Sequence, residues 1–561
     1  MKQTRSKVLI VTGSLTLSSG GMPGTSSQML KTQRDLFKAY QGAWLDVRLK
    51  LEIAELLLKF KLELNSAHFR KAAYHDIVKA YFRSPNSLDV PELTEVSLAT
   101  LLQREGIDYQ VMSVNQACAI NLDKDRRFEQ CKYVFLSSTL LRDLNELELV
   151  AAWFKRPDNK VIAGGALTGF VWQRWHGSPW IDVLAVGYGE YLVPALADWI
   201  KNDMKHLEAP PGGRIERRGK GIILCSGLPL SKNLDELPTP DWQLAQQYHQ
   251  REFPLVLYES VRGCPYRCGF CNYPYLFNDS QFRTRSAEKI AEDWEKLAYS
   301  GVKLISCLDS LFTVPRRRLE RLCHLLLFRD IQVKWICFAR ADDLLDPEIC
   351  GLMREAGCVK VAVGIESGSQ KILDNMNKRC SVDNNSRALQ NCRNAGLVTS
   401  TSLIVGYPGE TQRTVRETFD FLNINPPDIF HVYTLSIRAE GLPVLAAANR
   451  TRFSLEIHDD GRTAQPYWRH ESMSCNNAVD YARWLRISLI QQQVALEGTL
   501  FYANSLDWNI NHRKPLLEFQ KDVVTRHPVI NWLAGKADRF ASWQLERDMY
   551  RRMSDPSQVL V

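Results

Sequence analysis

The loop over 259–277 reads ESVRGCPYRCGFCNYPYLF and carries three cysteines, Cys264, Cys268 and Cys271. The apolar run FPLVLYES over 253–260 directly precedes the loop and predicts a buried strand. The spacing CxxxCxxC is too tight for a strand and gathers the three thiolates in one loop. Convergent thiolates hold a soft metal ion or an iron–sulfur cluster. The sequence therefore predicts a metal-binding loop at the end of a strand.

The choice between zinc and an iron–sulfur cluster depends on the fourth ligand. A structural zinc site takes four ligands close together. The nearest downstream histidine is His324, and the nearest upstream one, His249, lies across the predicted strand. A cubane cluster held by three cysteines leaves one iron open to a small ligand. We therefore predict a [4Fe-4S] cluster, with zinc as the alternative.

Strand and helix patterns alternate along 251–446. The strand stretches are FPLVLYES, KLISCLDS, VKWICFARADD, VKVAVGIESG, VTSTSLIVGYPGE and IFHVYTLSI. Strand–helix units repeated in this way imply a full or partial (β/α) barrel. The residues after it, 447–561, are rich in tryptophan, and we expect a helical domain on the substrate side.

The first 202 residues show a separate α/β pattern. Continuous apolar runs are typical of parallel strands that are buried on both faces, and they lie at 7–13, 107–114, 132–138, 160–165 and 181–190. Residues 1–202 are therefore predicted to form an open, Rossmann-like sheet. Residues 28–85 read as a helical insertion above the carboxyl ends of the strands. Residues 203–250 are predicted to be a linker, because proline and glycine interrupt the pattern there.

Composition narrows the class of protein. The 561 residues carry 71 basic and 63 acidic side chains, a net charge of +8, which does not predict nucleic-acid binding. Short basic clusters at 214–218 and 316–318 are interpreted as solvated surface. The sequence contains no run of ~20 uninterrupted apolar residues, so we expect no membrane span. The start MKQTRSKVLIVTG reads as a strand rather than a signal peptide, so we expect a cytoplasmic protein.

CxxxCxxC after the first barrel strand resembles the radical SAM superfamily, in which the open iron of the cluster chelates S-adenosylmethionine (SAM). The resemblance continues in CLDSLFT, CFARADD, VAVGIESGSQKILDNMNK and SLIVGYPGET. Each of these stretches ends a predicted barrel strand, where barrel active sites assemble. The resemblance implies a cluster on the three cysteines and SAM contacts from Phe270, Asp309, Ser310, Arg340, Glu366 and Ser367. Ion pairing at the barrel mouth is the alternative role for Asp309, Arg340 and Glu366.

The order of the domains resembles the cobalamin-binding branch of this superfamily, and its class B methyltransferases in particular. VIAGGALTG and VGYGEYLVPAL resemble stretches that pack against the corrin, and SSTLL resembles a loop along the nucleotide tail. This implies cobalamin contacts from Ser137, Gly164, Gly165, Tyr188 and Gly189. The segment after the first strand, TGSLTLSSGGMPG, lacks the histidine of the DxHxxG motif. A missing histidine fits this branch, and it also fits a domain that has lost cobalamin.

The resemblance implies an enzyme that methylates an unactivated carbon of a small molecule, a natural-product precursor or a peptide. Methylcobalamin and a 5′-deoxyadenosyl radical would carry the reaction, with electrons from a flavodoxin- or ferredoxin-like donor. A cobalamin-dependent radical cyclase or rearrangement enzyme without methyl transfer is the alternative. A non-catalytic cobalamin or cluster sensor is a third hypothesis. The C-terminal region contains no helix-turn-helix pattern that would favour the sensor.

The stretch PYWRHESMS over 466–474 in the C-terminal region combines polar and aromatic residues. Tyr467, Trp468, His470 and Met473 are candidates for substrate contact. An ordinary core seam is the alternative, because aromatic residues at regular spacing are usually core. The substrate itself is not identified by the sequence.

Overall fold

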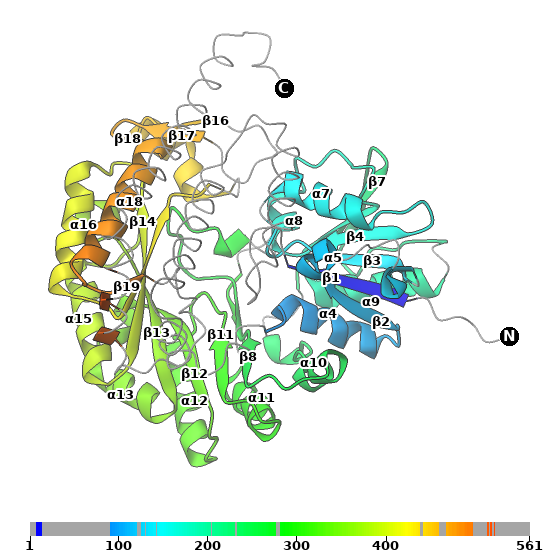
Figure 1. Cartoon of the computed structure of the whole chain (residues 1–561), viewed down its shortest axis with the longest axis horizontal. Coiled ribbons are helices and arrows are strands. Elements are labelled where there is room, and N and C mark those ends of the chain that lie inside the picture. The colour runs from blue at the N-terminus through cyan, green and yellow to red at the C-terminus, as the bar shows by residue number, and fades with distance from the viewer. Residues whose placement is uncertain are drawn as a thin grey trace, which may run out of the picture.

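The computed structural model describes residues 7–13, 90–119, 125–129, 131–141, 143–202, 205–229, 233–275, 281–437, 441–458 and 467–497, with a few positions between 513 and 521. These residues form two large parallel sheets that lie side by side (Figure 1). Within this part of the chain, no helix is long and apolar enough to cross a membrane. The helical insertion expected over 28–85 lies outside the described residues.

The N-terminal sheet has seven strands in the order β2-β1-β3-β4-β5-β7-β6. All neighbours are parallel except the β6–β7 pair. The strands are β1 (Lys7–Thr12), β2 (Tyr109–Ser113), β3 (Cys131–Ser137), β4 (Lys160–Gly164), β5 (Val183–Val186), β6 (Arg214–Arg218) and β7 (Gly221–Cys225). β1 pairs with β2 on one side and with β3 on the other, so the strand order reverses at β1. Ligands of open α/β sheets bind in the crevice at the carboxyl ends of such a pair of strands.

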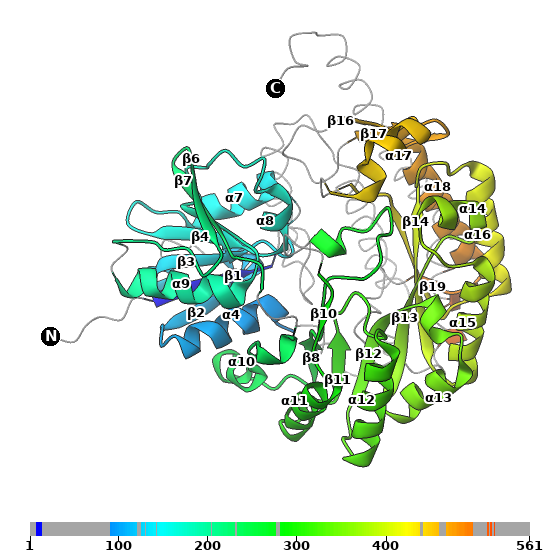
Figure 2. The same ribbon diagram turned by 180° about the vertical axis from the view of Figure 1, so that it is seen from behind.

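Both faces of this sheet are apolar because its strands are continuously hydrophobic. One face packs against α7 (Leu144–Phe154) and α8 (Ala166–Val171). The opposite face packs against α4 (Leu93–Arg104) and α9 (Gly189–Lys201) (Figure 2). Two short helices, α5 (Val114–Ala119) and α6 (Arg126–Glu129), complete the domain. The five strands predicted for this domain are confirmed.

The segment expected to be a linker, 203–250, is more structured than predicted. β6 and β7 lie within it and extend the N-terminal sheet as an antiparallel edge hairpin. This corrects the linker interpretation of 214–225, because Pro and Gly at 210–213 mark a turn before a strand. The rest of the segment holds η3 (Leu234–Glu236) and α10 (Trp242–His249). Asp241 caps the N-terminus of α10, because its carboxylate accepts hydrogen bonds from the backbone amides of Gln243 and Leu244.

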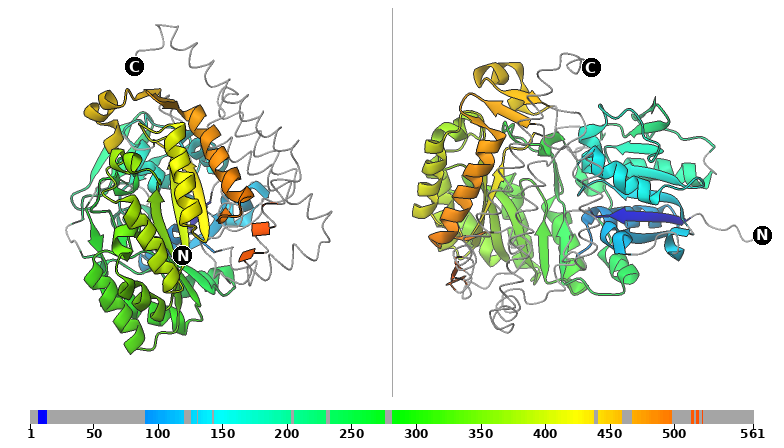
Figure 3. Two further views of the ribbon diagram at one scale, coloured as in Figure 1. Left: turned by 90° about the vertical axis from the view of Figure 1, so that its left-hand side faces the viewer. Right: turned by 45° about the horizontal axis from the view of Figure 1, so that its top comes forward.

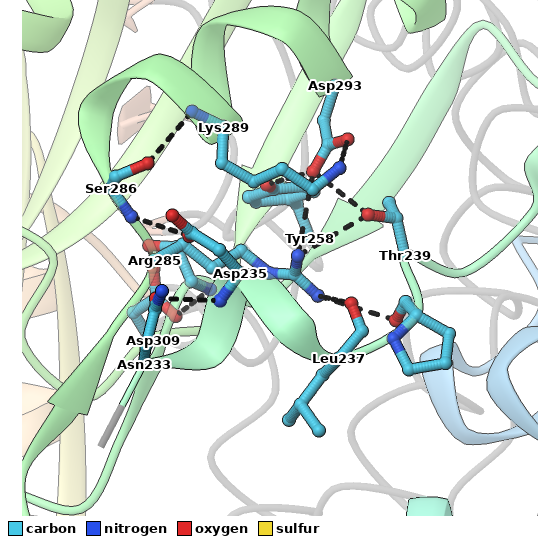
Figure 4. Close-up of polar contacts among 12 residues, drawn as sticks. Asn233, Asp235, Leu237, Thr239, Tyr258, Arg285, Ser286, Lys289, Asp293 and Asp309 are labelled. Carbon is cyan, nitrogen blue, oxygen red and sulfur yellow. Dashed lines mark hydrogen bonds and ion pairs between the residues drawn. The ribbon is translucent and has the colours of Figure 1, made fainter. Parts of the chain in front are cut away.

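The linker is fastened to the second sheet by a polar network (Figure 4). Arg285 donates hydrogen bonds to the carbonyls of Leu237 and Pro238, each at 3.4 Å. Asp293 accepts from the Thr239 hydroxyl at 3.0 Å and pairs with Lys289 at 2.6 Å. On the other side, the linker contacts α4 through the Thr100 hydroxyl, which accepts from the amide of Asp241 at 2.8 Å. The linker therefore has fixed contacts with both domains.

The second sheet is the predicted partial barrel. Its strand order is β19-β15-β14-β13-β12-β11-β8, all parallel. The strands are β8 (Leu255–Tyr258), β11 (Leu304–Cys307), β12 (Lys334–Arg340), β13 (Cys358–Glu366), β14 (Val398–Val405), β15 (Ile429–Thr434) and β19 (Leu496–Glu497). β8 and β11 lie at the side of the sheet that faces the N-terminal domain (Figures 1 and 2).

In the part of the chain that the structure describes, the helices of this domain cover the outer face of the barrel sheet (Figure 3). They are α11 (Ala287–Tyr299), α12 (Arg316–Phe328), α13 (Pro347–Glu355), α14 (Gln370–Asn375), α15 (Val382–Asn394) and α16 (Gln412–Ile424). The main core cluster joins their apolar sides to alternate strand residues such as Val361, Leu403 and Phe430. Because side chains alternate along a strand, the intervening residues line the inner face.

The C-terminal region was predicted to be helical, and the described part is mixed. α17 (Ala447–Arg452) and α18 (Cys475–Gln491) are helices, the second with a capping box between Ser474 and Asn477. Between them lies a three-stranded antiparallel sheet of β16 (Glu456–His458), β17 (Tyr467–His470) and β18 (Met473–Ser474). Within this stretch, residues 467–470 form β17 and residues 473–474 form β18, and the aromatic residues Tyr467 and Trp468 favour the strand.

Candidate functional site

The cysteine loop is closed at its base by a short antiparallel pair, β9 (Val261–Arg262) and β10 (Arg283–Thr284). Gly263 follows β9 with φ of 74°, and a Cβ there would lie 2.1 Å from the carbonyl oxygen of Gln281. Only glycine fits this close approach of the two ends of the loop. The Ser310 hydroxyl donates to the Gly263 carbonyl at 3.2 Å. The loop is thus fixed where the first barrel strand ends.

Arg340 places a positive charge beside the loop. Its Nη1 lies 3.8 Å from Sγ of Cys268, and its guanidinium stacks 3.9 Å above the ring of Tyr266. The side chain is 5% exposed and also pairs with Asp342 at 3.0 Å. The structure therefore places the predicted SAM residue Arg340 directly beside the cysteine loop.

Glu366 and Lys378 form a second buried pair at the same site. Lys378 Nζ lies 3.1 Å from Glu366 Oε1 and 5.8 Å from the centre of the Phe270 ring. A Cβ on Gly364 would lie 2.6 Å from that same carboxylate oxygen, so the pair folds over the inner face of β13. Burial lowers the pKa of Lys378, but the charges of Glu366 and Cys268 outweigh burial and raise it. Lys378 therefore stays cationic beside the loop.

Glu366 adopts a rare backbone conformation. Its φ is 66°, in the left-handed region that non-glycine residues seldom occupy. The pairing register between β13 and β14 shifts at this position. Such conformations cost about 1–3 kcal/mol and cluster at functional sites. This strain supports a functional rather than a purely structural role for the carboxylate.

The tip of the loop is held by the barrel. The amide of Gly269 donates to the Met376 carbonyl at 2.7 Å, and the Val444 amide donates to the Gly269 carbonyl at 3.2 Å. A Cβ on Gly269 would lie 2.0 Å from the Tyr407 hydroxyl. The loop therefore docks on the ends of several strands, with Phe270 next to these anchors.

Burial raises the pKa of the Cys264 thiol, and it raises the pKa of Cys271 to about 12. In the absence of a metal these two groups are protonated at neutral pH. Metal binding to thiolates therefore has to release protons. Among the described residues, no group of three His, Cys, Asp or Glu side chains is arranged to hold a single metal ion.

Three of the predicted SAM residues have other partners. Asp309 is fully buried and accepts from the Ser260 amide and hydroxyl, each at 2.6 Å, and from the Val261 amide at 2.7 Å. Burial raises the pKa of Asp309 to about 6 despite these bonds. Ser310 supports the base of the loop, as described above. Ser367 is fully buried with its hydroxyl 3.2 Å from that of Thr418 on α16.

In the N-terminal domain, three predicted cobalamin residues lie together at the carboxyl ends of β3 and β4. Ser137 and Gly164 are cross-strand partners. Gly165 has φ of 107°, and a Cβ there would lie 2.8 Å from the Thr139 hydroxyl oxygen. The strand ends therefore carry small residues, with the Thr139 side chain beside Gly165, and they lie next to the point where the strand order reverses.

Tyr188 and Gly189 start α9 and face different ways. The Tyr188 ring is 1% exposed, and its hydroxyl accepts a hydrogen bond from Arg283 of the barrel. By contrast, a Cβ on Gly189 would meet no atom within 4 Å. Of these two predicted residues, Tyr188 is buried, and Gly189 is the one at which an added side chain would have room.

Two residues that the sequence analysis did not select also belong to these sites. Glu92 precedes α4 and lies against the end of β1, where it accepts from the Gly13 amide, and its buried Oε2 has no hydrogen-bond partner among the residues that the structure describes. Burial raises the pKa of Glu92 to about 7. His431 lies on the inner face of the barrel, in one cross-strand row with Ser402, Gly364 and Arg340. The sequence analysis predicted this strand, and the alternation of side chains along IFHVYT could have indicated that His431 lies on the inner face of the barrel.

The C-terminal candidates are mostly core. Tyr467, Trp468 and Met473 are buried in the main core cluster, as in the alternative interpretation. Trp468 covers Gly406 at the end of β14, and its indole donates to the Leu435 carbonyl at 3.2 Å. His470 stacks on Trp468 with ring centres 5.6 Å apart, and burial lowers its pKa to about 4.

Comparison with known proteins agrees with this geometry. Residues 258–422 match the family model of the radical SAM superfamily. The chain is 28% identical over 289 residues to an anaerobic magnesium-protoporphyrin IX monomethyl ester cyclase of Rubrivivax gelatinosus, covering 49% of this chain and 50% of that one. It is 25% identical over 327 residues to the hopanoid C-3 methylase of Methylococcus capsulatus, covering 56% and 61%. The chain thus spans about half the length of the first relatives that it matches.

Two solved structures share the fold over most of the chain. The radical SAM methyltransferase TsrM of Kitasatospora setae, solved with tryptophan substrate and a SAM analogue, superposes with a TM-score of 0.60 at 17% identity, covering 77% of this chain and 97% of that one. The cobalamin-dependent radical enzyme OxsB, solved with aqua-cobalamin and SAM, gives 0.55 at 17% identity, covering 78% and 69%. Residues 258–422 therefore match the radical SAM superfamily, and the described chain shares the two-domain fold of these two solved structures.

Proposed function

We propose that this protein is a cobalamin-dependent radical SAM methyltransferase that acts on an unactivated carbon. The cysteine loop at the end of β8 carries the proposal, because it lies on the side of the barrel next to the N-terminal domain. A radical formed at this loop and a methyl donor bound at the carboxyl edge of the N-terminal sheet would then be neighbours. Hopanoid C-3 methylase among the relatives, and TsrM among the structures, support methyl transfer.

The residues at the loop fit a [4Fe-4S] cluster with SAM. Cys264, Cys268 and Cys271 supply three soft ligands on one loop. When bound, the cluster would supply the electron that cleaves SAM. Arg340 and Lys378 surround the loop with positive charge and would attract the carboxylate of SAM. The Phe270 ring lies within the same group of side chains.

The N-terminal strand ends fit a large, flat ligand such as a corrin. Gly164 and Gly165 carry no side chains, and the position of Gly189 is open. Glycines at strand ends let a planar ligand approach the backbone. Ser137 adjoins them in register and is a candidate hydrogen-bond partner for the nucleotide tail. When bound, cobalamin would supply the methyl group.

A radical cyclase or rearrangement enzyme is the second candidate. The observation that favours it is the similarity to the anaerobic magnesium-protoporphyrin IX monomethyl ester cyclases of Rubrivivax gelatinosus and Cereibacter sphaeroides, at 28% and 29% identity. Such an enzyme would use the same two sites without methyl transfer. For either reaction we expect a small-molecule or peptide substrate, a flavodoxin- or ferredoxin-like electron donor and a cytoplasmic location.

The first experiment is a metal and cofactor analysis of the protein purified without air from cells supplied with cobalamin. The proposal predicts about four iron atoms and one cobalt atom per chain. Incubation with a low-potential reductant and with SAM labelled in its methyl group then tests transfer, since the reduced cobalamin should take up the label. Iron without cobalt would remove methyl transfer through cobalamin. Cobalt without transfer of label would favour the cyclase.

A further inference from the structure

Both ends of the cysteine loop carry an arginine that reaches the other domain. Arg262 ends β9 just before the loop, and Arg283 begins β10 just after it. The two residues are cross-strand partners in the pair that closes the loop. Their side chains are 9% and 2% exposed. Two buried cations at the base of the loop therefore lie at the interface between the domains.

Arg262 is shared between the two domains. Its two terminal nitrogens pair with both carboxylate oxygens of Glu190 in the N-terminal domain, at 2.6 and 3.1 Å. Its Nε pairs with Glu259, which ends the first barrel strand, at 3.0 Å. Burial would raise the pKa of Glu190, but the charge and hydrogen bonds of Arg262 lower it. Fork-shaped pairing of this kind fixes geometry as well as distance.

Arg283 forms the second contact with the same turn. Its guanidinium donates to the Tyr188 hydroxyl and lies 4.8 Å from the centre of the Tyr188 ring. The guanidinium of Arg262 lies 5.5 Å from that ring. Tyr188 is therefore held between the two arginines by contacts that combine charge with an aromatic face.

The partners of both arginines flank Gly189. Tyr188, Gly189 and Glu190 are consecutive and form the turn from β5 into α9. The side-chain position of Gly189 is open, while its two neighbours are fixed by the barrel. A ligand that touches this turn at Gly189 thus touches the segment that holds the base of the cysteine loop.

We propose that Arg262 and Arg283, with Tyr188 and Glu190, form an interdomain clamp that positions the cysteine loop relative to a corrinoid bound in the N-terminal domain. These four are positioning residues, because they act on the loop and the turn. The inference rests on the proposed function for the identity of the ligand. The clamp contacts themselves do not depend on it.

The test is hydrogen–deuterium exchange of the backbone amides over 261–284, in the full chain under anaerobic conditions, with and without hydroxocobalamin. Glu190→Gln removes the interdomain half of the Arg262 pair and leaves Glu259 to balance the buried arginine. Glu259→Gln is the matched control, because it removes the same charge from the same arginine within the barrel. A Tyr188→Phe variant, which loses only one hydroxyl, serves if Glu190→Gln does not fold.

The clamp predicts about tenfold faster exchange over 261–284 in Glu190→Gln than in Glu259→Gln, as expected from the loss of a charged hydrogen bond. Hydroxocobalamin should slow this exchange in the unmodified chain and in Glu259→Gln, and should slow it much less in Glu190→Gln. Equal exchange in the two variants would overturn the clamp. So would bound hydroxocobalamin that leaves exchange over 261–284 unchanged.

Failure of the proposed function gives a different result. In that case the unmodified chain would not retain hydroxocobalamin after gel filtration, as measured by absorbance. The comparison of Glu190→Gln with Glu259→Gln in the absence of corrinoid would then still decide whether the interdomain contact holds the loop.

Discussion

The two large sheets of this protein are mainly parallel, but they differ in burial: one sheet has both faces buried, and the other has one buried and one partly exposed face. In the N-terminal sheet, Phe135 and Leu136 are adjacent on β3, point to opposite faces and are both buried. In the barrel sheet, Phe430 on β15 is fully buried, whereas Phe338 on β12 is 38% exposed on the inner face. The N-terminal sheet therefore offers a ligand only its edge. The barrel sheet offers its edge and a partly exposed, partly polar inner face.

This difference explains the chemistry that each sheet carries. The edge of the N-terminal sheet presents small residues, Ser137, Gly164 and Gly165, which suit a large ligand laid across strand ends. The barrel edge presents charged and sulfur-bearing groups, including Cys268, Arg340, Glu366 and Lys378, with His431 in the same cross-strand row as Arg340. The proposed binding platform and the proposed reactive centre would thus come from the same strand arrangement with different covering.

The largest expected effect concerns the reactive edge. Cys268→Ala should remove the cluster and abolish SAM cleavage, because two cysteines cannot hold a cubane with an open iron. Iron content and the brown absorbance report the cluster, and formation of 5′-deoxyadenosine reports cleavage. Cys323→Ala, on the buried side of α12, is the control and should keep both. Normal cleavage by Cys268→Ala would contradict the assignment of the loop.

The next prediction tests the difference between the faces. Phe430→Ala should lower the free energy of unfolding by about 3–5 kcal/mol, as for a buried aromatic side chain. Phe338→Ala should lower it by less than about 1.5 kcal/mol. In the N-terminal sheet, Phe135→Ala and Leu136→Ala should both be costly. Urea unfolding of the cofactor-free chain provides the measurement, and equal costs for Phe338 and Phe430 would refute the difference in burial between the two faces.

A third prediction uses Glu410, in the turn that follows β14. This carboxyl is 1% exposed and accepts from the Gly406 amide, and burial raises its pKa from 4.5 to about 8. The folded chain therefore holds this proton where the unfolded chain releases it. The stabilisation is complete below about pH 4.5 and is lost as the pH rises through about 8. At about 1.4 kcal/mol per pKa unit, the change is a few kcal/mol.

Glu410→Gln should therefore flatten the fall in unfolding free energy between pH 5 and pH 8, as followed by urea unfolding at each pH. Glu288 is the control with the opposite sign, because its hydrogen bond from Arg321 lowers its pKa. Glu288→Gln should have a small effect that does not flatten this fall. An unchanged pH profile for Glu410→Gln would mean that Glu410 is ionised in the folded chain.

The smallest effect is expected at the binding platform. Gly189→Leu should weaken hydroxocobalamin binding about tenfold, a cost near 1.4 kcal/mol, because the added side chain fills the open position. The unfolding midpoint should hardly move, since nothing lies within 4 Å. Gly165→Ala is the contrasting variant and should also lower stability, because its Cβ would meet Thr139. Unchanged affinity in Gly189→Leu would remove Gly189 from the corrinoid site.

The sequence predicted most strands of both sheets because continuous apolar runs and glycine-ended strands are local signals. It also predicted the grouping of Cys268, Phe270, Arg340 and Glu366, since strand ends of a barrel meet at one edge. It did not predict the β6–β7 hairpin, whose edge strand RIERR is polar. Nor did it find Lys378 or Glu92, because both reach their sites through tertiary contacts that leave no periodic pattern.

The burial of the cysteines has a practical consequence for handling this protein. Among the free cysteines that the structure describes, Cys264 and Cys271 are the ones that are not fully enclosed. An alkylating reagent applied to the folded, metal-free chain should therefore modify the loop first, and a bound cluster should block it. The mass added under brief alkylation would then serve as a gauge of cluster occupancy in every preparation, without reference to colour or turnover.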